Sequence, residues 1–495
     1  MTPHRVAMNS RIPALRVHAA NAAPLHTDGD FVLYWMIAAR RTHANFALER
    51  AIEHARVLGK PLVVFEPLRV GYRWASDRLH RFVIDGMADH APRFAAAGIT
   101  YLPYVEPREG AGSGLLAALA ERACVVVTDE YPCFFLPAMV AAAARRCPVR
   151  LEQIDGNGLL PLRAAQRGYD RAFDFRRHLQ KTLVPHLAEA PLPDPLASLR
   201  TAPLARLAAL PAAVATFPSP VEALLVGDVA AMAALPIDHA VAPVPYRGGE
   251  VAGRMRVKEF VARRLARYTE RNHPDADAAS GLSPYLHFGH VSAHEVFAAL
   301  SDAEDWSPER VSARVTAQAR GFWGMSEAAE AFFDELVTWR EVSLNTAFFR
   351  ADYDRYEGLP GWARATLEAH ANDPRPYTYA LPALEAAHTH DPIWNAAQRE
   401  LVREGRIHNY LRMLWGKKIL EWSATPREAF DTLVHLNNKY AVDGRDPSSY
   451  AGIAWVLGRY DRPWPERAIY GVVRTMSSDS TRKKVTLDRY LARFR

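Results

Sequence analysis

A carboxylate set among aromatic residues is one group in this sequence that could do chemistry. Residues 330–349 read EAFFDELVTWREVSLNTAFF and have the apolar periodicity of a helix. On such a helix Phe332, Glu335 and Trp339 share one face. A carboxylate between two aromatic rings loses part of its hydration, which raises its pKa and keeps a proton available for donation. The alternative, that Glu335 tilts into water at the edge of an apolar stripe, stays open.

A second predicted helix, residues 407–422, places an arginine and a glycine on one face. That face carries Asn409, Arg412, Met413 and Gly416. A buried arginine needs a charged partner, and the DGRD stretch downstream offers Asp443 and Asp446. Gly416 would let a flat ligand or another backbone approach closely.

Three tryptophans have a spacing that could carry electrons. Trp415 and Trp422 lie seven residues apart on the predicted helix, which places them on one stripe about 10 Å apart. Trp394 lies on the segment before. Indoles are readily oxidised, so this group could pass an electron. Tryptophans that only fill a core are the more ordinary arrangement, and this alternative also stays open.

Residues 280–289, SGLSPYLHFG, suit an anion. Ser283 before Pro284 is a good helix N-cap, with the proline at the first helical position. The exposed amides and hydroxyls of such a helix start could hold a phosphate or pyrophosphate. A plain cap without a ligand is the alternative.

The C-terminal region interleaves aromatic residues with cations. Phosphates held by charge and bases held by stacking would give a nucleic-acid surface, whereas a solvated basic tail is the alternative. The residues concerned are Trp455, Arg459, Arg462, Trp464, Arg467, Arg474, Arg482, Lys483 and Lys484.

Composition excludes several classes of protein. With 49% hydrophobic and 23% charged residues among 495, the chain is a folded protein of two or three domains, not a disordered chain, collagen-like repeat or coiled coil. A net charge of +6 favours a polyanionic partner. Three cysteines without a CxxC pair argue against a disulfide scaffold, a zinc ribbon or a cysteine-ligated iron–sulfur cluster, so no metal is expected.

Targeting signals are weak. No run of eighteen apolar residues predicts a membrane span, and residues 1–29 lack the apolar core of a signal peptide. We therefore expect a cytoplasmic protein with no membrane partner and a loose tail over 1–29. It would be nucleoid-associated only when bound to DNA.

Strands and helices alternate in the first half. Such alternation predicts a parallel sheet covered on both faces. The expected strands are 31–37, 61–67, 99–105, 124–129 and 149–154, and the expected helices are 45–58, 77–97, 114–123 and 136–146. The stretch AARRTHAN after the first strand lacks the glycines of a dinucleotide fingerprint, which argues against a NAD-type site there.

The sequence changes character twice. Residues 191–245 are rich in Ala, Leu and Pro and predict a long linker. From 246 to 495 helical periodicity dominates. The expected organisation is therefore a Rossmann-like α/β domain over 30–190, the linker, and an all-helical domain.

Six motifs together resemble the photolyase/cryptochrome flavoproteins, most closely the class II cyclobutane pyrimidine dimer photolyases. They occur in family order and spacing: LSPYLHFG (282–289), DELVTWRE (334–341), THDPIWNAAQ (389–398), GRIHNYLRMLWGKKILEW (405–422), LNNKY (436–440) and DGRDPSSYAGIAW (443–455). The resemblance implies an antenna domain followed by a helical FAD-binding domain. It implies light-driven repair of pyrimidine dimers in double-stranded DNA by a monomer, with reduced anionic FAD donating an electron to a flipped-out dimer.

The resemblance assigns the cofactor-binding residues. Tyr268 and the turn formed by Ser280, Gly281, Leu282 and Ser283 match the part of the family pattern that grips the FAD phosphates. Arg412 and Asp443 match an ion pair beside the isoalloxazine ring, and Asn437 matches the amide that faces flavin N5. Asn409 stands where a (6-4) photolyase has histidine, which favours the cyclobutane lesion.

The resemblance also assigns substrate and electron-transfer residues. Glu335 matches the acid that hydrogen-bonds the dimer carbonyl, and Arg474 matches a DNA contact beside the flipped bases. The walls of the lesion pocket match Trp339, Met413 and Trp455. The photoreduction relay matches Trp415, nearest the flavin, then Trp394 and Trp422.

One stretch departs from the family pattern. Class II enzymes carry acidic residues in the stretch that follows the first strand, and here residues 38–48 read AARRTHANFAL, with alanine in place of both acids. Charged pairs that would lock this part of the antenna domain are therefore expected to be missing, and an antenna chromophore of deazaflavin or folate type stays open. Two alternatives to repair also stay open: a cryptochrome-like blue-light photoreceptor and a dark, nucleic-acid-binding flavoprotein.

Overall fold

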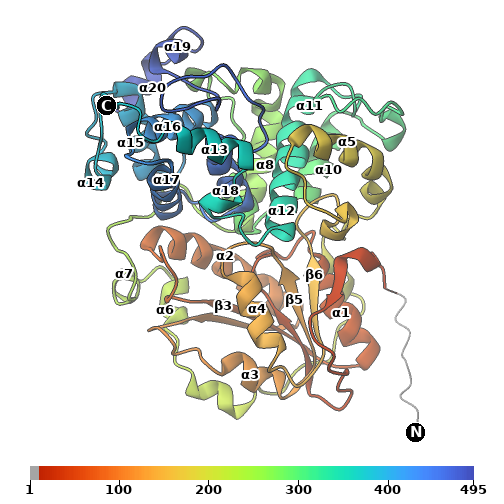
Figure 1. The fold of residues 1–495 in the computed structure, drawn as a ribbon. Helices are drawn as coiled ribbons and strands as arrows, with labels where there is room; N and C mark the ends of the chain where they lie inside the picture. The colour runs from red at the N-terminus through yellow and green to blue at the C-terminus, as the bar shows by residue number, and fades with distance from the viewer. Residues whose placement is uncertain (1–9) are drawn as a thin grey trace.

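The computed structural model describes residues 10–495. They form an α/β part and a helical part that lie against each other (Figure 1). The predicted fold class, a mainly parallel sheet with helices followed by an all-helical region, is confirmed.

The α/β part is built on a six-stranded sheet with the order β1-β6-β5-β2-β3-β4. All neighbouring strands are parallel except β1, which joins the edge antiparallel to β6. Every residue of β2 and β5 is buried, as in a sheet covered on both faces. The strands are β1 (Val17–Ala19), β2 (Phe31–Trp35), β3 (Leu62–Leu68), β4 (Thr100–Val105), β5 (Ala123–Glu130) and β6 (Leu151–Asp155).

Four helices cover the two faces of this sheet. The helices α1 (Phe46–Leu58) and α2 (Asp77–Ala96) pack on one face, and α3 (Leu115–Ala120) and α4 (Leu136–Ala144) pack on the other. The side chain of Asn45 caps α1 by accepting two backbone N–H groups. All four helices lie where apolar periodicity predicts them.

The N-terminal segment is ordered over part of the region expected to be a loose tail. A short 3-10 helix, Ala14–Arg16, leads into β1, which pairs with β6. The Arg16 side chain is fully buried and donates to the carbonyl oxygens of Asp155, at 3.2 Å, and Leu159, at 2.7 Å. The expectation of a loose tail is therefore wrong for residues 10–29, whereas residues 1–9 lie outside the described part of the chain.

The chain enters the helical part well before residue 190. Helix α5 (Ala172–Thr182) follows β6 and packs Phe175 and Leu179 into a core with α8 (Glu250–Arg263) and α11 (Glu327–Phe333). In Figure 1 this helix lies among the helices of the upper part. Residues 159–183 thus belong by packing to the helical part.

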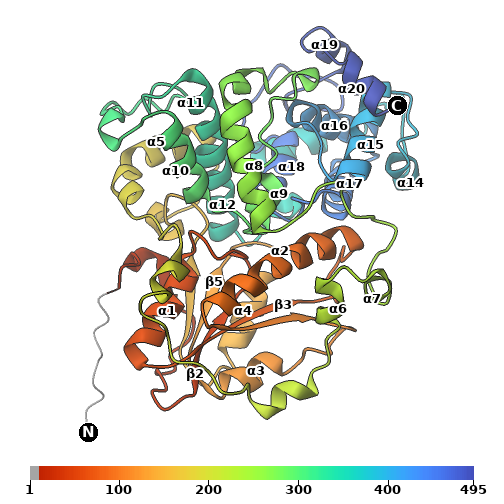
Figure 2. The ribbon, with the colours of Figure 1, turned by 180° about the vertical axis from the view of Figure 1, so that it is seen from behind.

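The segment 191–245 returns to the α/β part. Leu196 and Leu199 pack with α1, and Leu224 and Leu235 pack against α2. This segment includes the short helices α6 (Val221–Leu225) and α7 (Val229–Ala233), and Figure 2 shows it running down the outside of the α/β part. It is a long connection with short helices, as the composition predicts, but it is anchored along its length.

The helical part contains two buried cores. One surrounds α8, α10 (Ala293–Ala303) and α11, and the other surrounds α15 (Pro392–Glu404), α16 (Asn409–Trp422) and α17 (Pro426–Tyr440). The helix predicted over 330–349 is continuous from α11 into α12 (Arg340–Phe349), with a π-helical turn at Asp334–Trp339 between them. The remaining helices are α9 (Ser283–His287), α13 (Gly361–Ala369), α14 (Leu381–Glu385), α18 (Pro447–Val456), α19 (Ser478–Arg482) and α20 (Asp488–Arg493).

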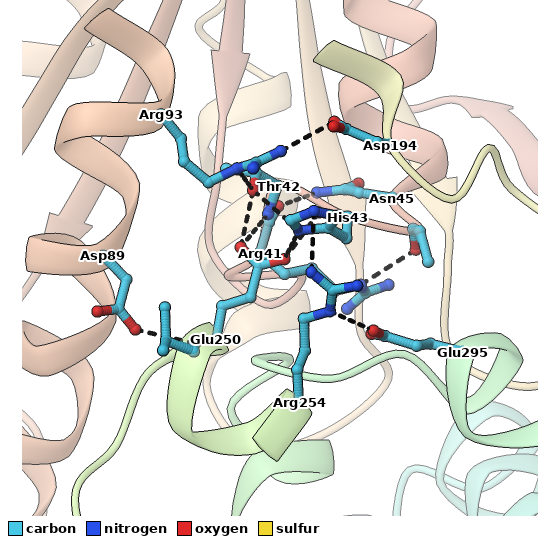
Figure 3. A network of polar contacts seen from close by, with 12 residues as sticks. Arg41, Thr42, His43, Asn45, Asp89, Arg93, Asp194, Glu250, Arg254 and Glu295 are labelled. Carbon is cyan, nitrogen blue, oxygen red and sulfur yellow. Dashed lines mark hydrogen bonds and ion pairs between the residues drawn. The ribbon is translucent and has the colours of Figure 1, made fainter. Parts of the chain in front are cut away.

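The loop after β2 is fixed by carboxylates from other segments. Glu250, at the start of α8, accepts hydrogen bonds from the backbone N–H of Thr42 and of His43, at 2.8 and 2.9 Å (Figure 3). Arg40 pairs with buried Glu66 at 2.8 Å. The expectation that charged pairs are missing here is therefore wrong, because Glu66 and Glu250 supply acids that the loop itself lacks.

Candidate active site

Glu335 lies in the π-helical turn, at the edge of the helical core. Its side chain is 35% exposed, and one carboxylate oxygen lies 3.2 Å from the Arg271 guanidinium. Burial raises the pKa of Glu335, and the Arg271 charge opposes this rise. Glu335 therefore neither tilts freely into water nor is buried in the apolar core, and its pKa moves in the direction predicted for a proton donor.

Arg271 is a functional candidate that the sequence did not single out. It directly follows the 3-10 helix Leu265–Glu270, and its guanidinium carbon lies 4.8 Å from the ring centroid of Tyr268. Tyr268 is buried and packs edge-on against Phe332 at 5.1 Å. Arg271 thus connects Tyr268 to Glu335, two residues predicted for different ligands.

Trp339 and Trp455 meet although they lie far apart in the sequence. Trp339 ends the π-helical turn and Trp455 lies near the end of α18, and their ring centroids are 5.4 Å apart. Both rings are partly exposed. The third residue predicted for this wall, Met413, is partly buried on α16 against the neighbouring core.

Arg412 and Asp443 form the predicted ion pair loosely. The guanidinium and carboxylate lie 3.5 Å apart. Within residues 10–495, Arg412 Nε and Asp443 Oδ1 are both buried without a hydrogen-bond partner. Buried polar atoms without partners are rare in proteins, so this pair suits a ligand that offers both a donor and an acceptor.

The end of α17 fixes the DGRD turn that carries Asp443. Arg445 donates to the backbone oxygen of Asn438 at 2.7 Å, and its own N–H donates to the Asn438 side chain at 2.8 Å. The adjacent Asn437 is buried, and its amide donates to Asn438 at 3.2 Å. These hydrogen bonds therefore fix the loop that carries Asn437 and Asp443. Asn409, in contrast, is exposed at the start of α16.

The turn at Ser280–Ser283 differs from its prediction in one detail. Ser283 is the first residue of α9, not its N-cap, and no side chain caps this helix. The turn is instead held by Arg256, which donates to the Ser280 carbonyl oxygen at 2.8 Å. Gly281 has φ of +67°, and a Cβ there would lie 2.5 Å from the Arg256 guanidinium. The sequence therefore permits a tight turn beside a cation, but the helix-cap argument for anion binding does not hold.

The three tryptophans are in contact in the predicted order. The rings of Trp415 and Trp394 are nearly parallel with centroids 6.5 Å apart, and Trp394 meets Trp422 edge-on at 5.4 Å. Hydrogen bonds orient the first two indoles: Trp394 Nε1 donates to the Trp415 carbonyl oxygen, and Trp415 Nε1 donates to Gln398. All three tryptophans are buried in the core. The two interpretations, core packing and electron relay, are therefore compatible.

Arg474 lies on the surface beside a tryptophan. It pairs with Asp461 at 3.0 Å, and its guanidinium carbon lies 4.5 Å from the ring centroid of Trp464. Its side chain is 43% exposed. Arg474 is thus orientated but remains accessible to a partner.

A large cavity lies where the sheet meets the helical part. Its volume is about 390 Å³, and its walls include Trp35, Tyr104, Arg40, Arg445 and Phe288. Trp35 Nε1 and the Tyr104 hydroxyl are buried without hydrogen-bond partners in the described chain. The sequence does not reveal this site, because its walls are aromatic and basic and carry no phosphate-binding glycine fingerprint.

Residues 10–495 contain neither a cluster of metal-binding side chains nor a helix suited to span a membrane. Among residues 10–495, no three His, Cys, Asp or Glu side chains are grouped so that they could hold a metal ion. The helices of this region also include none that combines the length and apolar character of a membrane span.

Solved structures share this fold. A bacterial class III photolyase from Agrobacterium tumefaciens matches with a TM-score of 0.67 and 19% identity, over 96% of this chain and 87% of that one. A cryptochrome from Synechocystis sp. PCC6803 matches with a TM-score of 0.62 and 16% identity, over 94% and 88% of the two chains. The fold is that of the photolyase/cryptochrome class.

Sequence similarity narrows this class. Over 490 residues the chain is 34% identical to the deoxyribodipyrimidine photo-lyase of Methanothermobacter thermautotrophicus, and the match covers 98% of this chain and 99% of the relative. A scan against models of protein families finds no match. The chain belongs to the deoxyribodipyrimidine photo-lyase family and is an enzyme of that type.

Proposed function

We propose that this protein is a class II photolyase that repairs cyclobutane pyrimidine dimers in double-stranded DNA with light. The observation that carries the proposal is the meeting of Trp339 and Trp455 at the end of the turn that holds Glu335. Two partly exposed indoles beside a protonatable carboxyl are suited to a pair of stacked bases with carbonyl oxygens.

FAD fits the residues of the helical part. Arg412 Nε and Asp443 Oδ1, which lack partners, would flank the flavin ring, and buried Asn437 would face it. Tyr268 and the turn formed by Ser280, Gly281, Leu282 and Ser283 would hold the phosphate side, and Asn409 would lie at the rim. When bound and reduced, FAD would supply the electron that splits the dimer. The Arg412 charge would stabilise the anionic form of the ring.

Glu335 would hold a proton for the lesion. Because burial raises its pKa, its carboxyl can donate a hydrogen bond to a dimer carbonyl and stabilise negative charge there. Trp339, Met413 and Trp455 would line the lesion, and Arg474 would contact DNA phosphate where bases leave the duplex. Trp415, Trp394 and Trp422 would deliver electrons that keep the cofactor reduced. A monomer carries all of these groups.

The cavity between the sheet and the helical part fits an antenna chromophore. Its aromatic walls suit a flat ring, and Arg445, which forms no ion pair within residues 10–495, suits an anionic one. The unpaired atoms of Trp35 and Tyr104 would bond to such a ligand. We therefore propose a deazaflavin or folate-type antenna there. Purified protein mixed with each compound should show energy transfer to flavin for the true ligand, and binding of neither would contradict this proposal.

A repair assay tests the main proposal. Plasmid DNA carrying thymine dimers is incubated with chemically reduced, FAD-loaded protein under blue light and in the dark. We expect dimers to disappear only in the light. Flavin photoreduction without repair would favour a cryptochrome-like photoreceptor, and absence of both would favour a dark flavoprotein. DNA affinity should weaken as salt concentration rises.

A further inference from the structure

The end of α18 supplies two rings that meet Trp339. Trp455 lies in the last turn of the helix, with its ring centroid 5.4 Å from that of Trp339. Tyr460 follows the helix, with its centroid 6.3 Å from that of Trp339. The Trp455 indole is partly exposed and forms no hydrogen bond within residues 10–495. The position of this indole therefore depends on how firmly the backbone at the end of α18 is held.

The carbonyl groups at this helix end differ in their hydrogen-bond donors. The oxygens of Ala454 and Trp455 accept backbone N–H groups from the turn at 457–459. The Val456 oxygen accepts no backbone N–H in the described chain. It accepts instead from Nζ of Lys417, on α16, at 2.5 Å. Because the last carbonyl groups of a helix need partners from outside it, Lys417 completes the end of α18.

Lys417 is an unusual residue for a buried position. It is 1% exposed, and among residues 10–495 no carboxylate lies within ion-pairing distance of its amine. Burial lowers the pKa of Lys417 to about 7, and the charge of Asp461, which is itself paired with Arg474 at 3.0 Å, opposes this shift. A methionine has a similar length and would fill the space without desolvating a charge. The lysine is therefore explained by its hydrogen bond and not by its packing.

Neighbouring residues of α16 place this contact beside the proposed lesion pocket. Gly416 permits the close approach of α18, because a Cβ there would lie 2.5 Å from a methyl group of Val456. Met413 precedes Lys417 by four residues and so lies on the same face of α16. The contact of Lys417 with Val456 thus connects the helix that carries Met413 to the helix that carries Trp455.

We propose that Lys417 is a positioning residue for lesion binding, because its hydrogen bond to Val456 holds Trp455 at the distance from Trp339 that admits the damaged bases. This inference rests on the role proposed above for the two indoles. Without the bond, a buried carbonyl oxygen would lack a donor. The end of α18 would then shift toward other donors and displace Trp455. Binding of flavin and of undamaged duplex would not depend on this bond.

Lys417→Met tests this role, because it removes the donor and keeps the length of the side chain. Binding is measured in the dark with FAD-loaded protein, so that no repair takes place. Fluorescence anisotropy compares a duplex that carries one thymine dimer with the same duplex without damage. We expect affinity for the damaged duplex to fall about tenfold, as for a buried acceptor left unpaired, and affinity for the undamaged duplex to change by less than about twofold. Unchanged affinity for the damaged duplex would overturn the inference.

A spectroscopic measurement follows Trp455 itself and needs neither DNA nor light. FAD-loaded protein labelled with fluorinated tryptophan gives a ¹⁹F resonance for Trp455, which is assigned by its absence in Trp455→Phe. We expect this resonance to shift or broaden in Lys417→Met, because the indole is no longer held in one position. An unchanged resonance would show that Lys417 does not position Trp455.

Tyr470→Phe is the matched control. The Tyr470 hydroxyl contacts the backbone oxygen of Lys417 at 2.9 Å and the Glu421 carboxylate at 3.0 Å. This variant therefore also removes a buried polar contact beside α16, but it leaves the bond to Val456 in place. It should lose stability and keep both the wild-type affinity for the damaged duplex and the wild-type Trp455 resonance. Equal changes in Tyr470→Phe and Lys417→Met would mean general destabilisation and would also overturn the inference.

Two further variants complete the test. Trp455→Ala should abolish the preference for the damaged duplex; if it does not, the proposed lesion pocket is wrong and the inference falls with it. If Trp455→Ala loses this preference while Lys417→Met keeps it, only the inference about Lys417 fails. Lys417→Gln, whose side chain is one bond shorter than that of lysine, gives the same comparison if Lys417→Met does not fold.

Discussion

Arg271 and Glu335 form an ion pair of 3.2 Å that connects the end of a 3-10 helix to the π-helical turn. Both side chains are partly exposed, so the pair is neither free in water nor locked in a dry core. Burial raises the pKa of Glu335 while the Arg271 charge lowers it. The pair therefore sets the protonation of the carboxyl at the place proposed for the lesion.

Repair should decline with rising pH through the titration of Glu335. The proton donor is present below the folded pKa of Glu335, which burial raises above its ordinary value, and is lost as pH rises through it. Arg271→Leu removes a charge that favours the carboxylate, so the decline should move to higher pH. The measurement is the yield of light-driven repair against pH with chemically reduced enzyme.

Two substitutions at Glu335 separate the effect of hydrogen-bond donation from the effect of the carboxylate charge. Glu335→Gln keeps an N–H donor and should abolish this pH dependence while it retains repair. Glu335→Ala should lower the yield by a factor on the order of ten, as expected for loss of one hydrogen bond to a group that becomes charged. An unchanged yield in the alanine variant, with FAD still bound, would argue against any role of Glu335 in repair.

Removal of Trp415 should separate photoreduction from repair. Trp415→Phe should block light-driven reduction of the flavin because the indole proposed to lie nearest to it is lost, yet repair by chemically reduced enzyme should persist. Trp306→Phe is the control, because Trp306 is packed in the other helical core against Trp323. Flavin absorbance under blue light is the readout. Normal photoreduction in Trp415→Phe would refute the relay.

Sequence patterns predicted what depends on local periodicity. The strands β2 to β6 and helices α1 to α4 lie where apolar runs and helical spacing placed them, because both faces of a parallel sheet demand apolar residues. The placement of Trp415 and Trp422 along α16 also needs only a few residues of local context. Their contacts with Trp394, on α15, depend instead on the packing of two helices.

Long-range contacts account for what the sequence did not predict. The three-residue strand β1 is too short to show alternation, and its place depends on the free edge of β6. Arg271 belongs to no recognisable sequence motif. Only its ion pair with Glu335 identifies it as a candidate site residue. The position of Ser283 shifted by one residue, within the usual uncertainty of helix ends.

The buried Arg16 should be important for stability. Its guanidinium satisfies two carbonyl oxygens and lies 3.8 Å from the Asp155 carboxylate, which would remain buried without it. Arg16→Ala should therefore lower the free energy of unfolding by about 3 kcal/mol or more. Arg122→Ala is the control, because the side chains of Arg122 and its partner Asp30 are 59% and 39% exposed, and it should cost less than about 1 kcal/mol. Urea denaturation of both variants measures the loss, and equal losses for Arg16→Ala and Arg122→Ala would contradict a special role for Arg16.

Gly416 is required by a neighbouring helix and not by a flat ligand. A Cβ at this position of α16 would lie 2.5 Å from a methyl group of Val456, at the end of α18. In a helix interior, alanine is otherwise more stable than glycine by about 1 kcal/mol, but overpacking costs about 1–3 kcal/mol. We expect Gly416→Ala to lower stability and to displace Trp455, the residue before Val456.

A second glycine provides the comparison. Gly452 lies within α18, and a Cβ there would meet no atom within 4 Å in the described chain. Gly452→Ala should therefore raise the thermal midpoint, whereas Gly416→Ala should lower it. In a Val456→Ala background, Gly416→Ala should lose most of its cost, because the methyl group it meets is gone. If the cost of Gly416→Ala is the same in both backgrounds, contact with Val456 is not the reason that glycine is required.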